Sequence, residues 1–375
     1  MNLSEKITIF LVAGEASGDL HGANLLKELK RQYPQAEFIG HGGDKMAREG
    51  LEIIEHIRKL SVMGFVEVIR HLPYFQKVMK STFEKIQTLK PQRIILIDYP
   101  GFNLRLAKKC KSLGIPITYF ILPQLWAWKE GRIKIIKECI DQSLCIFPFE
   151  QEWFESRGVP ANFVGHPFSD FSEIKFNSSD FYKKHGLEKD QPLLTLLPGS
   201  RQQEINLHWP IFLETAAILK KHIPNLALVL GRAKEVIFPS IPDFIIQEED
   251  AQRAMVSGTA ALTASGTASL ECAVLDTPEV VCYKMNLFSG FLAKKLNRAP
   301  FVAMVNLIAQ RKVVPEFVQG DMTAPNLAAA LLPLLSSTLE RKSMLTAFDE
   351  VRRTLGLPGV YERAGQAILS RMQHG

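Results

Sequence analysis

The chain has 375 residues, two to three times the usual length of one domain, which predicts two domains that each bury their own core. Hydrophobic residues make up 46% and charged residues 22%, ordinary values that exclude disordered and fibrous classes. The net charge is +6, and residues 1–165 hold 23 Lys and Arg against 18 Asp and Glu. This mild excess indicates an anionic surface or substrate near the first half and is too weak to indicate a nucleic-acid partner.

The five cysteines form no CxxC pair, and their odd number is typical of reduced thiols in a cytoplasmic protein. The apolar run at residues 7–13 has two readings, a short signal-peptide core or a first buried strand. The strand is favoured because polar residues follow the run directly. Nowhere is the sequence apolar over about 18 residues, the length that a transmembrane helix needs.

In the first half, short runs of Ile, Leu and Val alternate with helical patterns. The strand at 7–13 precedes a predicted helix at 20–33. Such continuous apolar runs indicate parallel strands that helices cover on both faces. Further strands are predicted at residues 93–97, 115–121, 143–147 and 162–164.

A polar segment at residues 166–192, rich in Ser, Asp and Lys, predicts a linker, after which the alternation restarts. The chain from about residue 323 onward is predicted to be helical. The sequence therefore predicts an α/β protein with two doubly wound, Rossmann-like units at 1–165 and 193–349, and a ligand site in a central cleft that both units face. The elements predicted in the second unit are strands at 193–197, 226–230, 260–263 and 280–283, and a helix at about 202–222.

The first strand runs into a turn with three glycines spaced four residues apart, beginning at Gly14. This spacing differs from the GxGxxG dinucleotide fingerprint, so a dehydrogenase is disfavoured. The turn brings three candidate catalytic residues, Glu15, Ser17 and Asp19, to the edge of the sheet where ligands bind. Capping of the following helix is the alternative role for Ser17 and Asp19.

Asp98 directly follows the predicted strand at 93–97, and the next residues, Tyr99-Pro100-Gly101, force the chain out of the strand. A carboxylate at this end of a central strand faces the ligand site and can accept a proton there. Its alternative role is to cap the helix that begins near Phe102.

Two turns in the second half are predicted to bind a diphosphate. Each follows a buried strand and precedes a helix, so free backbone N–H groups and the positive end of the helix dipole meet at one point. Arg201 adds a guanidinium. One turn into the second of these helices, Glu271 is a candidate for binding ribose hydroxyls, with an exposed surface carboxylate as the alternative. The residues of the two turns are Gly199, Ser200 and Arg201, and Ser265, Gly266 and Thr267.

Metal-binding patterns such as DxD and HExxH are absent from the sequence, so we expect no metal and no cofactor. A bound diphosphate would then be neutralised by helix dipoles and by Arg201.

Residues 62–80 form an apolar, helical pattern flanked by cations and interrupted by Pro73. Such a helix usually faces a core, but this pattern is apolar on more than one stripe, which is typical of a helix lying on an anionic bilayer. A second apolar and cationic stretch, at 287–301, is expected on the same surface. The predicted lipid-facing residues are Val62, Met63, Phe65, Val66, Val68, Ile69, Leu72 and Phe75.

Nine short motifs occur in order along nearly the whole chain: AGEASGD at 13–19, SVMG at 61–64, IDYPGFN at 97–103, WAW at 126–128, FPFE at 147–150, VGHP at 164–167, LPGSR at 197–201, ASGTA at 264–268, and NLI at 306–308 with VPE at 314–316. Together they resemble the lipid-A-disaccharide synthases, which are membrane-associated inverting glycosyltransferases of the two-domain GT-B type. The departures are small: PQL at 123–125 stands where a serine is expected, and residues 99–101 vary among relatives.

The resemblance implies transfer of 2,3-diacylglucosamine from UDP-2,3-diacylglucosamine to the 6-OH of 2,3-diacylglucosamine 1-phosphate, giving a β-1,6-linked disaccharide 1-phosphate and UDP. It implies that Asp98 is the general base and that Asn306 and Glu316 belong to the nucleotide site. It also implies a cytoplasmic enzyme held peripherally at the inner membrane, with C-terminal helices, at about 350–375, that return to the first domain and join subunits into a homodimer.

Two other classes stay open at this point. A sugar-nucleotide epimerase or hydrolase would share the UDP site and need no lipid-facing helix. A non-catalytic module that binds UDP-sugars or lipids would tolerate replacement of Asp98.

Overall fold

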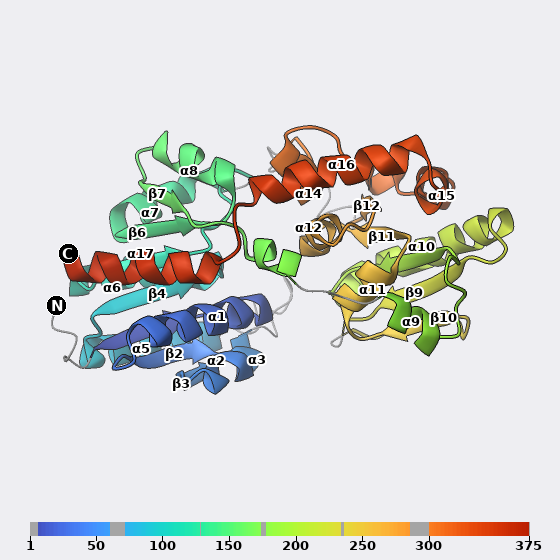
Figure 1. Cartoon of the computed structure of the whole chain (residues 1–375). Coiled ribbons are helices and arrows are strands. Elements are labelled where there is room, and N and C mark those ends of the chain that lie inside the picture. The colour runs from blue at the N-terminus through green and yellow to red at the C-terminus, as the bar shows by residue number, and fades with distance from the viewer. Residues whose placement is uncertain are drawn as a thin grey trace. The chain divides into compact units, whose positions relative to one another are not determined.

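The computed structural model describes residues 7–60, 72–127, 129–173, 178–233, 236–285 and 300–374. Contacts divide the chain into two compact units. Unit 1 consists of Met1–Pro167 together with Gly356–Gly375, and unit 2 of Phe168–Leu355 (Figure 1). Each unit is an α/β domain built on a parallel sheet, so the predicted fold class is confirmed.

The described part of unit 1 contains a seven-stranded parallel sheet with the order β3-β2-β1-β4-β5-β6-β7. The central strands are runs of fully buried Ile, Leu and Val, as expected for strands covered on both faces. The strands are β1 (Thr8–Val12), β2 (Glu37–Gly42), β3 (Glu52–His56), β4 (Arg93–Ile97), β5 (Ile117–Phe120), β6 (Gln142–Cys145) and β7 (Ala161–Phe163).

Helices follow most of these strands, and the last helix of the chain belongs to the same unit. That helix, α17, contacts α1: the His21 ring nitrogen Nδ1 lies 2.9 Å from the Tyr361 hydroxyl, and Arg31 forms an ion pair of 2.9 Å with Glu362. The helices of unit 1 are α1 (Ala16–Gln32), α2 (Asp44–Arg48), α3 (Ile57–Leu60), α5 (Leu72–Leu89), α6 (Pro100–Cys110), α7 (Ile133–Cys139), α8 (Pro148–Glu155) and α17 (Val360–His374).

The described part of unit 2 contains a six-stranded parallel sheet with the order β10-β9-β8-β11-β12-β13. Its strands are β8 (Leu193–Leu197), β9 (Ala227–Gly231), β10 (Ile245–Glu248), β11 (Ala260–Ala264), β12 (Glu279–Tyr283) and β13 (Glu316–Val318). Its helices are α9 (Ser178–Lys184), α10 (Gln202–His222), α11 (Ala251–Ser257), α12 (Thr267–Val274), α14 (Met304–Ala309), α15 (Ala324–Leu331) and α16 (Leu339–Thr354).

The segment expected to be a linker, residues 166–192, contains the helix α9. Phe181 of this helix is fully buried against Leu193 of β8 and Val229 of β9. Contacts therefore assign α9 to unit 2, and the chain passes between the units at Pro167 and again at Leu355.

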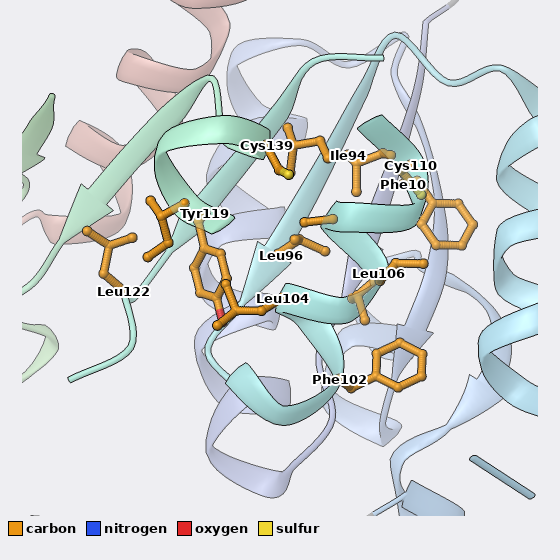
Figure 2. Close-up of a cluster of buried hydrophobic side chains, with 14 of the residues drawn as sticks. Phe10, Ile94, Leu96, Phe102, Leu104, Leu106, Cys110, Tyr119, Leu122 and Cys139 are labelled. Carbon is orange, nitrogen blue, oxygen red and sulfur yellow. The ribbon is translucent and has the colours of Figure 1, made fainter. Parts of the chain in front are cut away.

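Aromatic and aliphatic side chains of α6 fix the position of β4 in unit 1. Figure 2 shows Phe102, Leu104 and Leu106 of α6 in one buried cluster with Ile94 and Leu96 of β4. Burial of each such side chain contributes about 1.5 to 3 kcal/mol. This packing fixes the carboxyl end of β4, where the chain leaves the sheet.

In both sheets the strand order reverses direction at a topological switch point. The switch lies between β1 and β4 in unit 1 and between β8 and β11 in unit 2. Ligands of open α/β sheets bind beyond the carboxyl ends of the strands at such points. In unit 1 these ends carry the turn at Gly14 and Asp98, and in unit 2 they carry the turns at Gly199 and Gly266.

Candidate functional site

The carboxyl ends of β1 and β4 place Glu15, Ser17 and Asp98 at one edge of the first sheet. Glu15 and Ser17 are exposed, and Asp98 is partly buried. Because β1 and β4 are hydrogen-bonded neighbours, Glu15 and Asp98 lie in the turns that follow two adjacent strands. The structure thus brings Glu15, Ser17 and Asp98 to one place, and their catalytic role stays a prediction.

The backbone at Asp98 is strained and firmly held. Asp98 and Tyr99 have φ values of 47° and 50°, in the left-handed region that ordinary residues avoid. Two side chains stabilise this conformation: the Asn103 amide nitrogen and the Tyr119 hydroxyl donate to the Asp98 carbonyl oxygen at 2.7 and 2.6 Å. Strain retained in this way is characteristic of functional sites.

Gly14 is needed because the Tyr99 ring lies against it. A Cβ atom at position 14 would come within 2.1 Å of the Tyr99 ring atom Cδ1. The glycine turn after β1 and the strained turn after β4 therefore pack directly on each other, which fixes the distance between the two strand ends.

The carboxyl group of Asp98 is tuned toward neutral pH. Burial and, secondarily, the charge of Glu15 raise the pKa of Asp98 to about 6, while hydrogen bonding from the Tyr99 backbone opposes the shift. At pH 7 the group is mainly ionised and can accept a proton, and a base with a pKa near the working pH is the most effective catalyst.

Asp19 has a structural role. It is 4% exposed, and its carboxylate accepts hydrogen bonds from the backbone N–H groups of Gly43 (2.7 Å), Lys45 (3.1 Å) and Met46 (3.1 Å). These are N–H groups at the start of α2, which Asp19 caps from a distance of 24 residues in the sequence. Because the carboxylate accepts all three of these hydrogen bonds, we assign Asp19 a structural role in place of the predicted catalytic one.

Glu150, fully buried at the start of α8, is a residue to which the sequence analysis gave no role. Its carboxylate accepts from the Trp126 indole N–H at 3.0 Å and from the Phe147 backbone N–H at 3.2 Å. Burial raises the pKa of Glu150 to about 7, and the charge of Asp98 adds to the rise. Neither contact was predicted from the sequence: Phe147 is not a residue that signals a helix cap, and Trp126 lies 24 residues earlier.

The first predicted diphosphate turn, after β8, is occupied by a carboxylate of its own helix. Gly199 has φ of 127°, and the N–H groups of Ser200 and Arg201 donate to Glu204 at 2.9 and 3.2 Å. Arg201 also lies 3.5 Å from Glu204, and its side chain is 74% exposed. In this state the guanidinium of Arg201, and not those two amides, is open to a ligand.

The second turn, after β11, is more open. Gly266 has φ of 152°, and an added Cβ atom would meet nothing within 4 Å. Thr267 begins α12 there, and Ser265 donates to the Val302 carbonyl at 2.8 Å. Glu271 accepts a hydrogen bond from the Gln252 side chain at 3.0 Å, and burial raises the pKa of Glu271. Glu271 is therefore not the exposed surface carboxylate that the sequence left open as the alternative.

Asn306 and Glu316 form a network with each other and with the backbone. The Asn306 amide donates to Glu316 at 2.8 Å, and its oxygen accepts from the N–H groups of Val313 and Val314 at 2.7 and 2.9 Å. Glu316 also accepts from the backbone N–H of Ala303 at 2.8 Å. These contacts give both residues a role in shaping the start of β13, and their contact with a nucleotide stays a prediction.

Most of the predicted lipid-facing residues lie outside the described residues, as does nearly all of the second stretch at 287–301. Phe75 is described, and it packs against the buried cluster of unit 1 with its ring 5.9 Å from that of Phe102, so its predicted contact with lipid is wrong. Among the helices that the structure describes, none has the length and apolar character of a membrane span. All five cysteines are buried free thiols. Over the described residues, no three His, Cys, Asp or Glu side chains are grouped closely enough to hold a metal ion.

Comparison with known proteins identifies the family. The model of the lipid-A-disaccharide synthetase family matches residues 9–369. A lipid-A-disaccharide synthase of Myxococcus xanthus is 37% identical, with 98% of each chain covered. Two solved structures share the fold: the glycosyltransferase of kitacinnamycin (TM-score 0.64, 14% identity, 98% of this chain and 99% of that one) and the UDP-GlcNAc 2-epimerase from Neisseria meningitidis bound to UDP-GlcNAc (TM-score 0.62, 11% identity, 98% and 100%).

At such low identity the two structures show the fold alone, which has two α/β units of the GT-B type. The family match and the 37% identity over nearly the whole chain favour a lipid-A-disaccharide synthase over the two alternatives, an epimerase or hydrolase and a non-catalytic binding module. The chain belongs to the lipid-A-disaccharide synthase family and is a glycosyltransferase.

Proposed function

We propose that the chain transfers 2,3-diacylglucosamine from UDP-2,3-diacylglucosamine to the 6-OH of 2,3-diacylglucosamine 1-phosphate with inversion at the anomeric carbon. The products are a β-1,6-linked, tetraacylated disaccharide 1-phosphate and UDP. The single observation that carries this proposal is the ionisable, conformationally held Asp98 at the switch point of the first sheet.

Asp98 acts as the general base. A sugar hydroxyl is too weak an acid to ionise at pH 7, so its proton leaves as the oxygen attacks the anomeric carbon. With a pKa of about 6, Asp98 is ionised before the reaction and takes that proton. General base catalysis of this kind is worth about 10²-fold to 10⁴-fold in rate.

Unit 2 binds the nucleotide and stabilises the departing UDP. The exposed guanidinium of Arg201 and the open backbone at Gly266 and Thr267 supply positive charge and N–H donors for a diphosphate. A structure of the same fold holds UDP-GlcNAc, which supports a UDP-sugar as the donor. Charge that develops on the leaving diphosphate is neutralised by these groups.

The direct test incubates the purified chain with both diacylated substrates and identifies products by mass spectrometry. We expect a tetraacylated disaccharide 1-phosphate and one equivalent of UDP, with or without a metal chelator. Release of UDP without any acyl-sugar acceptor would instead indicate a hydrolase. Formation of an isomerised UDP-sugar would indicate an epimerase.

We also propose a cytoplasmic enzyme bound peripherally to the inner membrane through the apolar pattern at 62–72. The support is the sequence pattern and the basic balance of residues 1–165. Replacing the four aliphatic residues at 66, 68, 69 and 72 by Ser should move the protein from membrane to soluble fractions while the circular dichroism spectrum stays unchanged. Loss of the folded state would assign the segment to the core instead.

The C-terminal region supports a further proposal, a homodimer. Leu339 at the start of α16 and Leu357, just before α17, are 81% and 78% exposed, so each offers apolar surface to a second chain. Sedimentation equilibrium should give twice the chain mass, and Leu339→Ser with Leu357→Ser should give the mass of one chain. A monomer in the unmodified protein would refute the dimer.

A further inference from the structure

His208 is a fully buried histidine in α10 that none of the predicted sites includes. Its ring is fixed from two sides by aromatic neighbours. It stacks on Phe212 with a centroid distance of 6.4 Å and an interplanar angle of 12°, and it meets Tyr283 edge-on at 5.8 Å. Burial of a polar ring costs free energy unless hydrogen bonds replace those that it made with water, so the ring nitrogens are expected to have partners.

Both ring nitrogens of His208 contact backbone, and the two contacts join separate parts of the sheet. Nδ1 donates to the Pro198 carbonyl oxygen at 2.8 Å. Nε2 lies within hydrogen-bond distance of the Lys284 backbone, 3.1 Å from its nitrogen and 3.2 Å from its carbonyl oxygen. Pro198 begins the turn after β8, and Lys284 directly follows β12.

Because β11 lies between β8 and β12 in the sheet, the ladder does not pair these two strand ends directly. The imidazole of His208 therefore connects two loops across the carboxyl edge of the sheet. Glu204 holds the same turn from within, by accepting from the N–H groups of Ser200 and Arg201, and these contacts do not connect it to the loop after β12.

A small pocket of about 90 Å³ lies between the two loops that His208 connects. Its lining includes Arg201 from the turn after β8 and Tyr283 and Lys284 from the end of β12. Glu204 also lines it and offsets the charge of Arg201, to which it is paired at 3.5 Å. Lys284 leaves a net positive charge in the pocket.

We propose that His208 is a positioning residue that holds together the two loops that carry Arg201 and Lys284, so that both side chains line one pocket and bind a phosphoryl group of the nucleotide. This inference rests on the proposed function and adds to it a second cation, Lys284, and the residue that fixes the geometry. Binding of the phosphoryl group gains from two convergent cations only if both loops keep their spacing.

The test measures UDP affinity of the full chain by calorimetry in two variants. His208→Leu keeps the buried volume and removes both hydrogen bonds, whereas His208→Gln keeps a donor and an acceptor. We expect at least about a tenfold loss of UDP affinity for His208→Leu, as for loss of a positioned charged contact, and partial recovery for His208→Gln. The matched control, His222→Leu, changes an exposed histidine at the end of the same helix and should leave the affinity unchanged.

Since His208→Leu removes buried hydrogen bonds, its fold is checked by circular dichroism and thermal unfolding. Lys284→Met supplies a second test that leaves the buried core intact, and it too should weaken UDP binding about tenfold. Wild-type UDP affinity in folded His208→Leu, or in Lys284→Met, would overturn the inference. Tight UDP binding by a wild-type chain that forms no disaccharide would refute the proposed function and leave the pocket in place.

Discussion

Replacing the carboxyl group of Asp98 by an amide should make the protein more stable at neutral pH while it becomes inactive. Asp98→Asn keeps the size of the side chain and removes the group whose ionisation is penalised by burial and by Glu15. Active-site groups that are held in unfavourable states for catalysis commonly reduce stability in this way.

The magnitude follows from the pKa. The folded state raises the pKa of Asp98 from 3.8 to about 6, so ionisation of this group disfavours the folded state by up to about 3 kcal/mol. The cost is absent well below pH 4, where Asp98 is protonated in both states. It grows as the pH rises through the ordinary pKa and is fully present above the folded-state value. The advantage of Asp98→Asn should thus be about 3 kcal/mol at pH 7.5 and about half of that at pH 5.

The assay is urea unfolding at pH 5 and pH 7.5, followed by tryptophan fluorescence; Trp126 and Trp153 report on unit 1. Glu152→Gln, which removes an exposed carboxylate of α8 in the same unit, is the matched control and should change the free energy of unfolding by less than about 0.5 kcal/mol. If Asp98→Asn is equally stable or less stable than the parent at pH 7.5, the carboxylate is not under the electrostatic penalty on which its role as a base depends.

Three further substitutions separate chemistry from structure. Glu15→Gln removes a charge that raises the pKa of Asp98, so the acidic limb of the pH profile of kcat/KM should move to lower pH; an unmoved limb would show that Asp98 does not feel Glu15. Asp19→Ala leaves three backbone N–H groups without their acceptor and should lower the free energy of unfolding by about 2 to 4 kcal/mol, with turnover per folded molecule nearly unchanged; a selective loss of turnover would restore Asp19 as a catalytic residue. Gly14→Ala would place a Cβ atom 2.1 Å from the Tyr99 ring and should reduce kcat at unchanged UDP affinity; normal kcat would show that the ring can move freely.

The parts of the fold that the sequence predicts well are those with a strong local pattern. The strands β4 and β8 and the helix α10 have the predicted bounds, because uninterrupted Ile and Leu runs and a long amphipathic repeat have few other structures open to them. The strands β2, β3, β10 and β13 were missed. β2 contains two glycines among its six residues, and β13 has three residues in all, so neither has a strand-like run.

The site was predictable to the extent that it lies at strand ends. Asp98, Arg201 and Gly266 each follow a buried strand, and both sheets place those strands at a switch point. Roles that depend on contacts distant in sequence were not predictable. The N–H groups that Asp19 caps lie at least 24 residues away, and the partner of Glu150 is 24 residues away as well.

The most direct test of the central claim compares turnover and UDP binding in one variant. For Asp98→Asn, kcat for disaccharide formation should fall by about 10²-fold to 10⁴-fold, while the Kd for UDP stays within about twofold of the parent. Loss of the base with the nucleotide site intact gives this pattern. Near-normal turnover would remove Asp98 from the role of proton acceptor, and with it the chemistry proposed for this edge of the first sheet.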